Sequence, residues 1–221
     1  MECDMTDLVN TWQTLLAKYT SSVHATNVGR ALVFDWSRPD RYHHNVAHLR
    51  AVLTHVDELA HHATDPDLVR LAGWYHDAVY NCRPGDEENS ALRAERELRA
   101  LDLKPAAVSE VGRLVRLTRT HSPADGDRNG EALCDADLAI LGASPLQYDA
   151  YAQAIRAEYS QFSDDEFRIG RTQALQALLA APSLFHTPLG HQRWEAAARA
   201  NITLELHTIT LQNTTISTGE P

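Results

Sequence analysis

The sequence predicts an all-α fold. Apolar residues recur at steps of three and four along most of the 221-residue chain, which is the period of a helix with one buried face. Alternation of apolar and polar residues over more than four positions is hard to find before the C-terminal tail. Stretches rich in Asn, Pro and Gly, such as "NCRPGDEENS", separate the helical patterns and indicate loops.

The expected helices follow one another without an internal repeat or a long linker. Asp65 is the expected N-cap of one of them, with Pro66 at its first position. Gly142 is the expected end of another. In chain order the expected helices cover residues 8–16, 44–56, 66 to about 80, 88–101, 105–118, 132–142, 145–161, 164–181 and 189 to about 207.

Composition narrows the classes of function. The net charge of -10, with no dense cluster of Lys and Arg, argues against polymeric nucleic acid as a partner. No apolar run reaches the length of a membrane helix, so no membrane partner is expected. The acidic N-terminus does not resemble a signal peptide, and the three cysteines form no CxxC pair. A cytoplasmic location with reduced thiols is the resulting expectation.

Three short stretches place imidazoles and carboxylates among apolar residues. In "RYHHNVAHL", His44 and His48 are one turn apart on the helix expected to begin near His44, while His43 is expected to point away. In "WYHDAVY", His76 and Asp77 are costly to bury unless they are paired or bind a metal. His44 and His48 could instead be ordinary polar residues near a helix end. His76 and Asp77 could be paired by a hydrogen bond without any metal.

The third stretch, "LCDADLAILG", holds Asp135 and Asp137 between apolar residues. Two carboxylates at this spacing on an apolar helix are expensive to bury without a cation. Either aspartate could instead cap the helix, and Asp135 is better placed to do so.

Taken in order, these stretches resemble the H…HD…D signature of the HD-domain metal-dependent phosphohydrolases over residues 41–142. The resemblance implies a single all-α HD domain and a metal bound by His48, His76, Asp77 and Asp137, with Asp135 as the rival to Asp137. The His44-Asn45-x-x-His48 segment is also similar to a stretch of the cyclic-nucleotide phosphodiesterases, which implies that His44 is a general acid. The chain departs from that branch after Asp77, where "AVYN" replaces a second Asp-His pair.

Across residues 36–206 the chain resembles a small bacterial group of predicted HD-superfamily phosphohydrolases, for which no substrate is agreed. The stretches that carry this likeness are "RYHHNVAHL", "WYHDAVYN", "DEENSA", "DADLAILG", "YDAYAQAIRAEY", "FRIGRTQAL" and "ARANITLEL". A divalent metal ion is the implied cofactor. Nitrogen and carboxylate ligands without a thiolate suit manganese, iron, nickel, cobalt, zinc or magnesium.

Three further residues are candidates for supporting roles. Glu88, like Asp77, is a candidate catalytic residue that could act on the attacking water, although acidic residues also favour the first turn of a helix. His121 could bind substrate or a second metal. It could also lie at a helix end only because the helix dipole favours a protonated imidazole there. Arg171 could bind a substrate phosphate or form a structural ion pair.

The resulting hypothesis is a divalent-metal-dependent phosphohydrolase that cleaves a phosphate ester in a small, nucleotide-like metabolite. The alternatives are an HD-fold di-iron oxygenase, a non-catalytic nucleotide-binding regulatory protein and a purely structural helical bundle. One domain is expected over 1–221, with a metal-binding core at about 41–142, C-terminal helices at about 145–207 and a flexible tail at 208–221. The apolar C-terminal "ITLELHTITL" is compatible with a homodimer.

Overall fold

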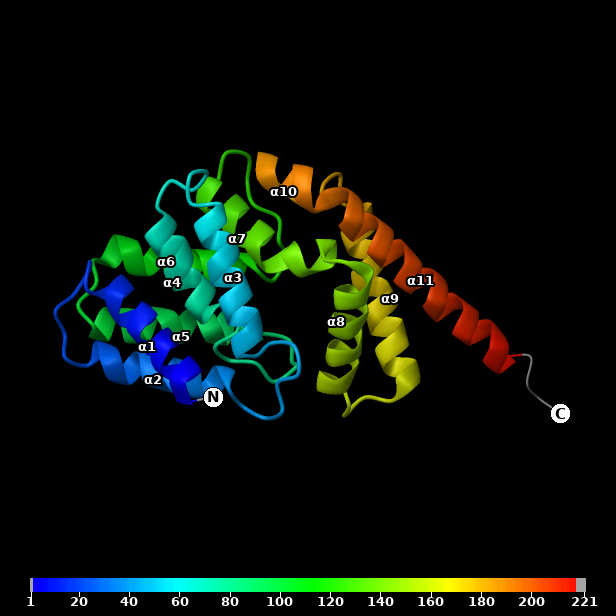
Figure 1. The fold of residues 1–221 in the computed structure, drawn as a ribbon, viewed down its shortest axis with the longest axis horizontal. Coiled ribbons are helices and arrows are strands. Elements are labelled where there is room, and N and C mark those ends of the chain that lie inside the picture. The colour runs from blue at the N-terminus through cyan, green and yellow to red at the C-terminus, as the bar shows by residue number, and fades with distance from the viewer. Residues whose placement is uncertain (1, 218–221) are drawn as a thin grey trace. The chain divides into compact units, whose positions relative to one another are not determined.

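The computed structural model describes the backbone of residues 2–217 and the side chains of residues 6–211. Residues 2–217 form α-helices and one short 3-10 helix, with no strand, so the all-α prediction is confirmed (Figure 1). No helix within this range is both long enough and apolar enough to cross a membrane. The helices are α1 (Glu2–Leu16), α2 (Ala25–Trp36), α3 (Val46–Glu58), α4 (Pro66–Tyr75), α5 (Asp86–Ala100), α6 (Pro105–Leu117), α7 (Arg128–Leu138), η1 (Ala139–Gly142), α8 (Pro145–Glu158), α9 (Asp164–Ala180), α10 (Pro188–Arg193) and α11 (Glu195–Ser217).

The chain divides into two compact units, Met1–Asp137 and Leu138–Pro221. The first contains α1 to α6 and nearly all of α7, and the second contains η1 and α8 to α11. Every residue of the candidate metal centre lies in the first unit. This division into compact units does not test the expectation of a single domain over 1–221 with a core at about 41–142. That expectation stays a prediction.

Helix α4 is the centre of the first unit. It packs against α3, α5 and α6 (Figure 1). From Leu68 to Tyr75 every residue of α4 except Arg70 is buried. Trp74 and Tyr75 are fully buried and meet the edge of Trp12 from α1, with ring centroids 5.4 and 5.9 Å apart. This central position places the C-terminal end of α4, and the residues that follow it, inside the unit.

Helix α4 ends five residues earlier than expected. It begins as predicted, with the Asp65 side chain accepting from Leu68 N and Pro66 at the first position. It was expected to run to about Tyr80, but it ends at Tyr75. Two side chains of α5 bind the backbone beyond it: Ser90 Oγ pairs with both N and O of Val79, and Asp86 Oδ2 accepts from Asn81 N. The His76-Asp77 pair therefore lies in a turn and not on the helix.

Helix α3 begins later than expected. The side chain of Asn45 accepts hydrogen bonds from Ala47 N and His48 N, which makes Asn45 the N-cap and Val46 the first helical residue. His48 is therefore in the first turn of α3, and His44 lies before the helix. The prediction that His44 and His48 share a helical face is wrong.

Helix α2 has no counterpart among the expected helices. Its N-cap residue, His24, makes no side-chain capping hydrogen bond. Instead, Gly29 lies directly against Trp12 of α1, whose indole N–H donates to Ala25 O at 2.8 Å. Trp36, at the other end of α2, donates its indole N–H to Trp74 O at 3.0 Å. The helix is held mainly by tertiary packing, which local sequence signals do not display.

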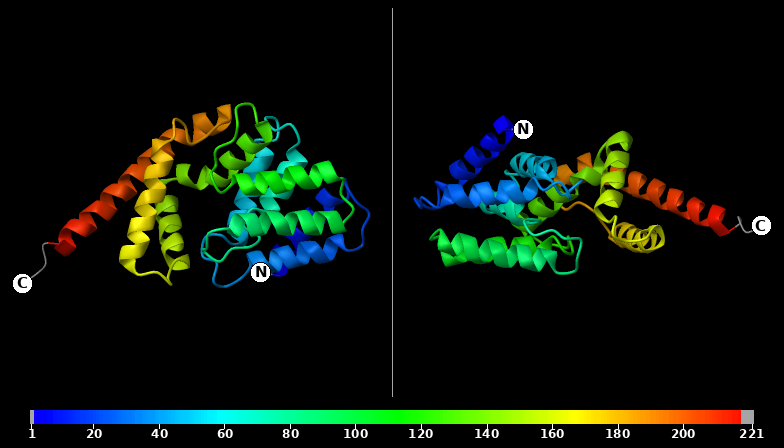
Figure 2. Two further views of the ribbon diagram at one scale, coloured as in Figure 1. Left: turned by 180° about the vertical axis from the view of Figure 1, so that it is seen from behind. Right: turned by 90° about the horizontal axis from the view of Figure 1, so that it is seen from below.

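In the second unit, α11 contacts η1, α9 and α10. The buried side chain of Asn201 donates to the carbonyls of Leu141 and Ala143, at 2.8 and 3.0 Å, which fixes α11 to η1. Figure 2 shows α11 continuing well past this contact. The expectation that the last helix ends near His207 is wrong, because α11 runs to Ser217. Residues 218–221 of the tail lie outside the described residues.

Candidate metal centre

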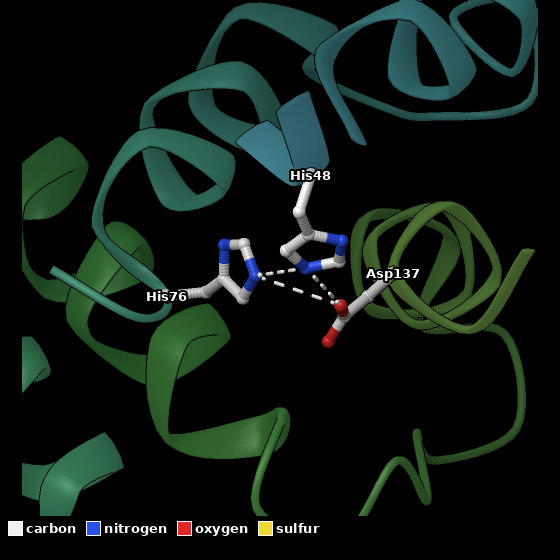
Figure 3. A group of neighbouring side chains, drawn as sticks. All are labelled: His48, His76 and Asp137. Carbon is white, nitrogen blue, oxygen red and sulfur yellow. Dashed lines mark hydrogen bonds and ion pairs between the residues drawn. The ribbon is translucent and has the colours of Figure 1, made fainter. Parts of the chain in front are cut away.

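Three of the four predicted ligands meet at one point. His48 comes from the start of α3, His76 directly follows α4, and Asp137 lies near the end of α7 (Figure 3). His48 Nε2 is 3.2 Å from both His76 Nε2 and Asp137 Oδ1, and His76 Nε2 is 3.5 Å from that oxygen. One ligand atom from each residue lies within 4.8 Å of the other two. Two imidazole nitrogens and a carboxylate oxygen are a donor set that divalent transition metals accept.

The orientation of His76 fits metal binding. Its Nδ1 lies 2.8 Å from the carbonyl oxygen of Gly73, to which only a protonated nitrogen can donate. In the neutral ring this leaves the lone pair on Nε2, which points at His48 and Asp137. Two imidazole nitrogens facing each other at 3.2 Å need a proton or a shared cation between them.

The electrostatics of the group fit a cation. Burial disfavours charge on His76, but the carboxylates of Asp77 and Asp137 outweigh burial and raise its pKa well above the usual range. Burial lowers the pKa of His48. Burial also opposes ionisation of Asp137, yet His76, His121 and His48 hold the pKa of this carboxyl well below its usual range. The centre is therefore a buried place that favours one positive charge.

Asp77 adjoins the group without joining it. Its Oδ2 lies 3.1 Å from His76 Nε2 and 3.9 Å from His44 Nε2. It is absent from the set of mutually close ligand atoms, which consists of His48, His76 and Asp137. The side chain is 15% exposed, so it lies at the edge of the centre next to His44. Asp77 thus lies beside the ligand group and beside the predicted general acid.

His44 and His43 both belong to the surroundings of the centre. The His44 ring stacks on Tyr80 with centroids 4.1 Å apart, and it lies 5.6 Å from the ring of His48. The expectation that His43 points away is wrong, since its ring centroid is 4.6 Å from that of His48. Burial is the main reason that the pKa of His43 is lowered. Because both residues precede α3, the turn at 42–45 and not a helical period decides where they point.

His121 contacts Asp137 from the far end of α6. Its Nε2 lies 2.9 Å from Asp137 Oδ2, the oxygen that is not directed at His48 and His76. The backbone of His121 has φ +48°, a left-handed conformation that is uncommon outside glycine. Its N–H bonds to Leu117 O at 2.9 Å and closes the last turn of α6. His121 therefore lies beside the ligand group, and its predicted role in binding substrate or a second metal stays a prediction.

Three other predicted residues are not part of the ligand group of His48, His76 and Asp137. Glu88 is exposed, and its carboxylate is held by the guanidinium of Arg116 at 2.7 and 2.9 Å. Asp135 is fully buried on α7 but is not part of the ligand group. In the second unit, Arg171 forms a two-pronged ion pair with Glu205. Glu88 and Arg171 are each held in an ion pair, and their predicted roles at the site stay predictions. Asp137 is the aspartate that belongs to the ligand group.

Sequence reasoning missed the residues that shape the turn after α4. Asp86 Oδ2 accepts from the backbone N–H groups of Asn81 and Arg83 at 2.7 and 3.1 Å, and Ser90 holds Val79. Arg41 is buried and bonds to backbone carbonyls on both sides of the centre. All three lie in stretches already noted for the family likeness, "RYHHNVAHL" and "DEENSA". The sequence analysis quoted both stretches, but it gave Arg41, Asp86 and Ser90 no role.

Comparison with known proteins adds no assignment. No family model, no curated protein and no solved structure matches the chain.

Proposed function

We propose that the protein is a divalent-metal-dependent phosphohydrolase that cleaves a phosphate ester in a small, nucleotide-like metabolite. One observation carries the proposal: His48 Nε2 from the start of α3, His76 Nε2 from the turn after α4 and Asp137 Oδ1 from the end of α7 converge on one point. The carbonyl of Gly73 directs the His76 lone pair there, which is an arrangement suited to a ligand. The H…HD…D order of the sequence supports the same reading.

His48, His76 and Asp137 hold the ion, with Asp77 beside it. A divalent cation in this position supplies Lewis acidity, which lowers the pKa of a water molecule and offsets charge on phosphoryl oxygens. His121 bonds to Oδ2 of Asp137 and so fixes the direction of Oδ1. The half-buried ring of His43 and the buried ring of Trp36 border the centre.

His44 is the proposed general acid. In hydrolysis, a water oxygen attacks phosphorus, the bond from phosphorus to the leaving oxygen breaks, and that oxygen takes up a proton. His44 Nε2 lies 3.9 Å from Asp77 Oδ2, so a protonated ring has a carboxylate next to it. Stacking on Tyr80 at 4.1 Å fixes the plane of the ring. His44 is therefore positioned to hold a proton and deliver it to the leaving oxygen.

A metal-dependent hydrolysis assay tests the proposal. Protein stripped with a chelator is incubated with a panel of nucleotides and other phosphomonoesters and phosphodiesters, with and without manganese. The expected result is turnover that requires added metal, is lost in His76→Ala and survives in His61→Ala. His61 is an exposed histidine bonded to the carbonyl of Glu58, outside the centre, and serves as the matched control. Unchanged turnover in a His76→Ala protein that binds no metal would overturn the assignment.

A di-iron oxygenase is the second candidate, and the placement of His121 favours it. Asp137 presents one oxygen to His48 and His76 and the other to His121, so its carboxylate has imidazoles on two sides. A site for two ions needs this kind of shared carboxylate. Two irons per chain together with oxygen uptake would favour the oxygenase, and one ion per chain with metal-dependent release of phosphate would favour the hydrolase.

A further inference from the structure

Arg41 is a buried cation that joins two segments of the candidate metal centre. Its residue surface is only 5% exposed. Nη1 donates to the carbonyl oxygens of His44 and Asp77 at 3.1 and 2.8 Å, and Nη2 donates to that of Ala78 at 3.3 Å. His44 precedes α3, whereas Asp77 and Ala78 follow α4. One guanidinium therefore binds the backbone of both segments that carry the predicted chemistry.

Two aromatic rings enclose this guanidinium. Its carbon lies 5.2 Å from the ring centroid of Trp36 and 5.7 Å from that of Tyr80, which is the range of cation–π contacts. The same rings face the histidines of the centre: Trp36 is 5.3 Å from His76, and Tyr80 is stacked on His44. A displacement of Arg41 would therefore move His44 and His76 in two ways, through the backbone hydrogen bonds and through the rings of Tyr80 and Trp36.

The chemistry of arginine suits this position better than that of any other residue. Burying a cation is costly unless it is compensated, and here backbone carbonyls and aromatic faces compensate it. The planar guanidinium can address carbonyls in several directions at once and stack on rings. A lysine ammonium is a single point of charge and cannot reproduce contacts to three carbonyls and two rings.

We propose that Arg41 is a positioning residue of the candidate metal centre. By holding the carbonyls of His44, Asp77 and Ala78, it sets the distance between the segment that carries the proposed general acid and the His76-Asp77 turn. The inference rests on the proposed function, because it assigns Arg41 a role in the same site.

Cobalt binding and turnover of the full chain test this role. Cobalt(II) is the probe, because its visible absorption spectrum reports ligand geometry and its titration gives the affinity. Arg41→Met is expected to weaken cobalt binding about tenfold to a hundredfold, the range found for residues that support metal ligands. The absorption spectrum is expected to shift, and kcat to fall by a larger factor than KM rises. Arg41→Lys is expected to lie between the parent and Arg41→Met.

Arg199→Met is the matched control. Arg199 also binds three backbone carbonyls, those of Leu179, Ala181 and Pro182, but it lies in the second unit. Its replacement is expected to lower the melting temperature while leaving the cobalt spectrum and affinity unchanged.

The outcomes separate the two hypotheses. A parent protein that binds no cobalt and hydrolyses nothing overturns the proposed function, and the role of Arg41 with it. A parent that binds cobalt, with a folded Arg41→Met variant of equal affinity, spectrum and kcat, overturns the role of Arg41 alone. If Arg41→Met does not fold, Arg41→Lys decides by the same measurements, and parental values there overturn the inference.

Discussion

His121 Nε2 lies 2.9 Å from Oδ2 of Asp137, whose other oxygen faces His48 and His76. The two residues come from different helical regions, the end of α6 and the last turn of α7. The contact settles the rotation of the carboxylate, so that Oδ1 is the oxygen left for a metal. The backbone of His121 holds the ring in this place with φ +48°, a conformation that is uncommon outside glycine.

Replacing His121 should weaken metal binding without abolishing it. His121→Ala removes the partner of Asp137 Oδ2 and frees the carboxylate to rotate. Supporting residues of this kind are worth about tenfold to a hundredfold in metal affinity. We expect that loss in a manganese titration monitored by calorimetry, with one ion per chain in both proteins. A parent with two ions and a variant with one would instead identify His121 as a ligand and favour the di-iron alternative.

Asp137 and Asp135 should differ sharply in their effect on metal binding. Only Asp137 is in the ligand group, although both lie on α7 and both are shielded from solvent. Asp137→Asn keeps the shape of the side chain and removes its charge, so metal retention after dialysis should fall below detection. Asp135→Asn should retain the ion, because the change leaves His48, His76 and Asp137 in place. Loss of metal in both variants with intact folding would contradict this assignment.

Much of the fold was open to prediction because helical periodicity is local. The stripes of α1, α3 and α6 and the Asp65-Pro66 start of α4 were visible in single windows of sequence. Helix α2 was not predicted, because the contact that holds Gly29 against Trp12 joins two helices that are separate in the sequence. The end of α4 was predicted wrongly for a similar reason. Asp86 and Ser90, which bind the backbone after α4, belong to another helix, α5.

The sequence was enough to identify which residues form the candidate site, but not how their side chains are arranged. His48, His76 and Asp137 were identified because burying such groups is costly unless something compensates them. The prediction for His43 failed, because it assumed a helical step where the chain makes a turn before Asn45. Arg41 was quoted within a motif but given no role, since its partners are backbone carbonyls, which have no signature in sequence.

Two glycine substitutions should change stability in opposite directions. An added Cβ at Gly29 would clash with Cδ1 of the Trp12 ring, so Gly29→Ala forces a rearrangement between α1 and α2. Such overpacking costs about 1–3 kcal/mol. Gly170, within α9, has nothing within 4 Å of an added Cβ, so Gly170→Ala should stabilise by about 0.5–1 kcal/mol. Urea unfolding of both variants against the parent measures the two shifts, and a stable Gly29→Ala protein would contradict the packing argument.

Asp86 and Glu88, two residues apart in one motif, should behave differently. Asp86→Ala leaves the N–H groups of Asn81 and Arg83 without their acceptor and should cost about 1–3 kcal/mol. Because Asp86 shapes the turn after His76, manganese affinity should fall as well. Glu88→Ala removes an exposed ion pair with Arg116 and should leave stability and turnover close to those of the parent. A large loss of kcat in Glu88→Ala would restore Glu88 as a catalytic residue.

Arg171 should prove to be a structural residue of the second unit. Its guanidinium holds both oxygens of Glu205 at 2.8 and 3.0 Å, with side chains only 10% and 15% exposed. Arg171→Met leaves the largely shielded Glu205 carboxylate with the Tyr148 hydroxyl, 2.6 Å away, but without its cation, and breaking such a pair costs about 3–5 kcal/mol. Adding Glu205→Leu should recover part of this loss, because the unpaired charge is removed. Cobalt affinity of the first unit's centre should stay at the parental value in both variants, whereas a phosphate-binding role would show as a raised KM in a variant with normal unfolding.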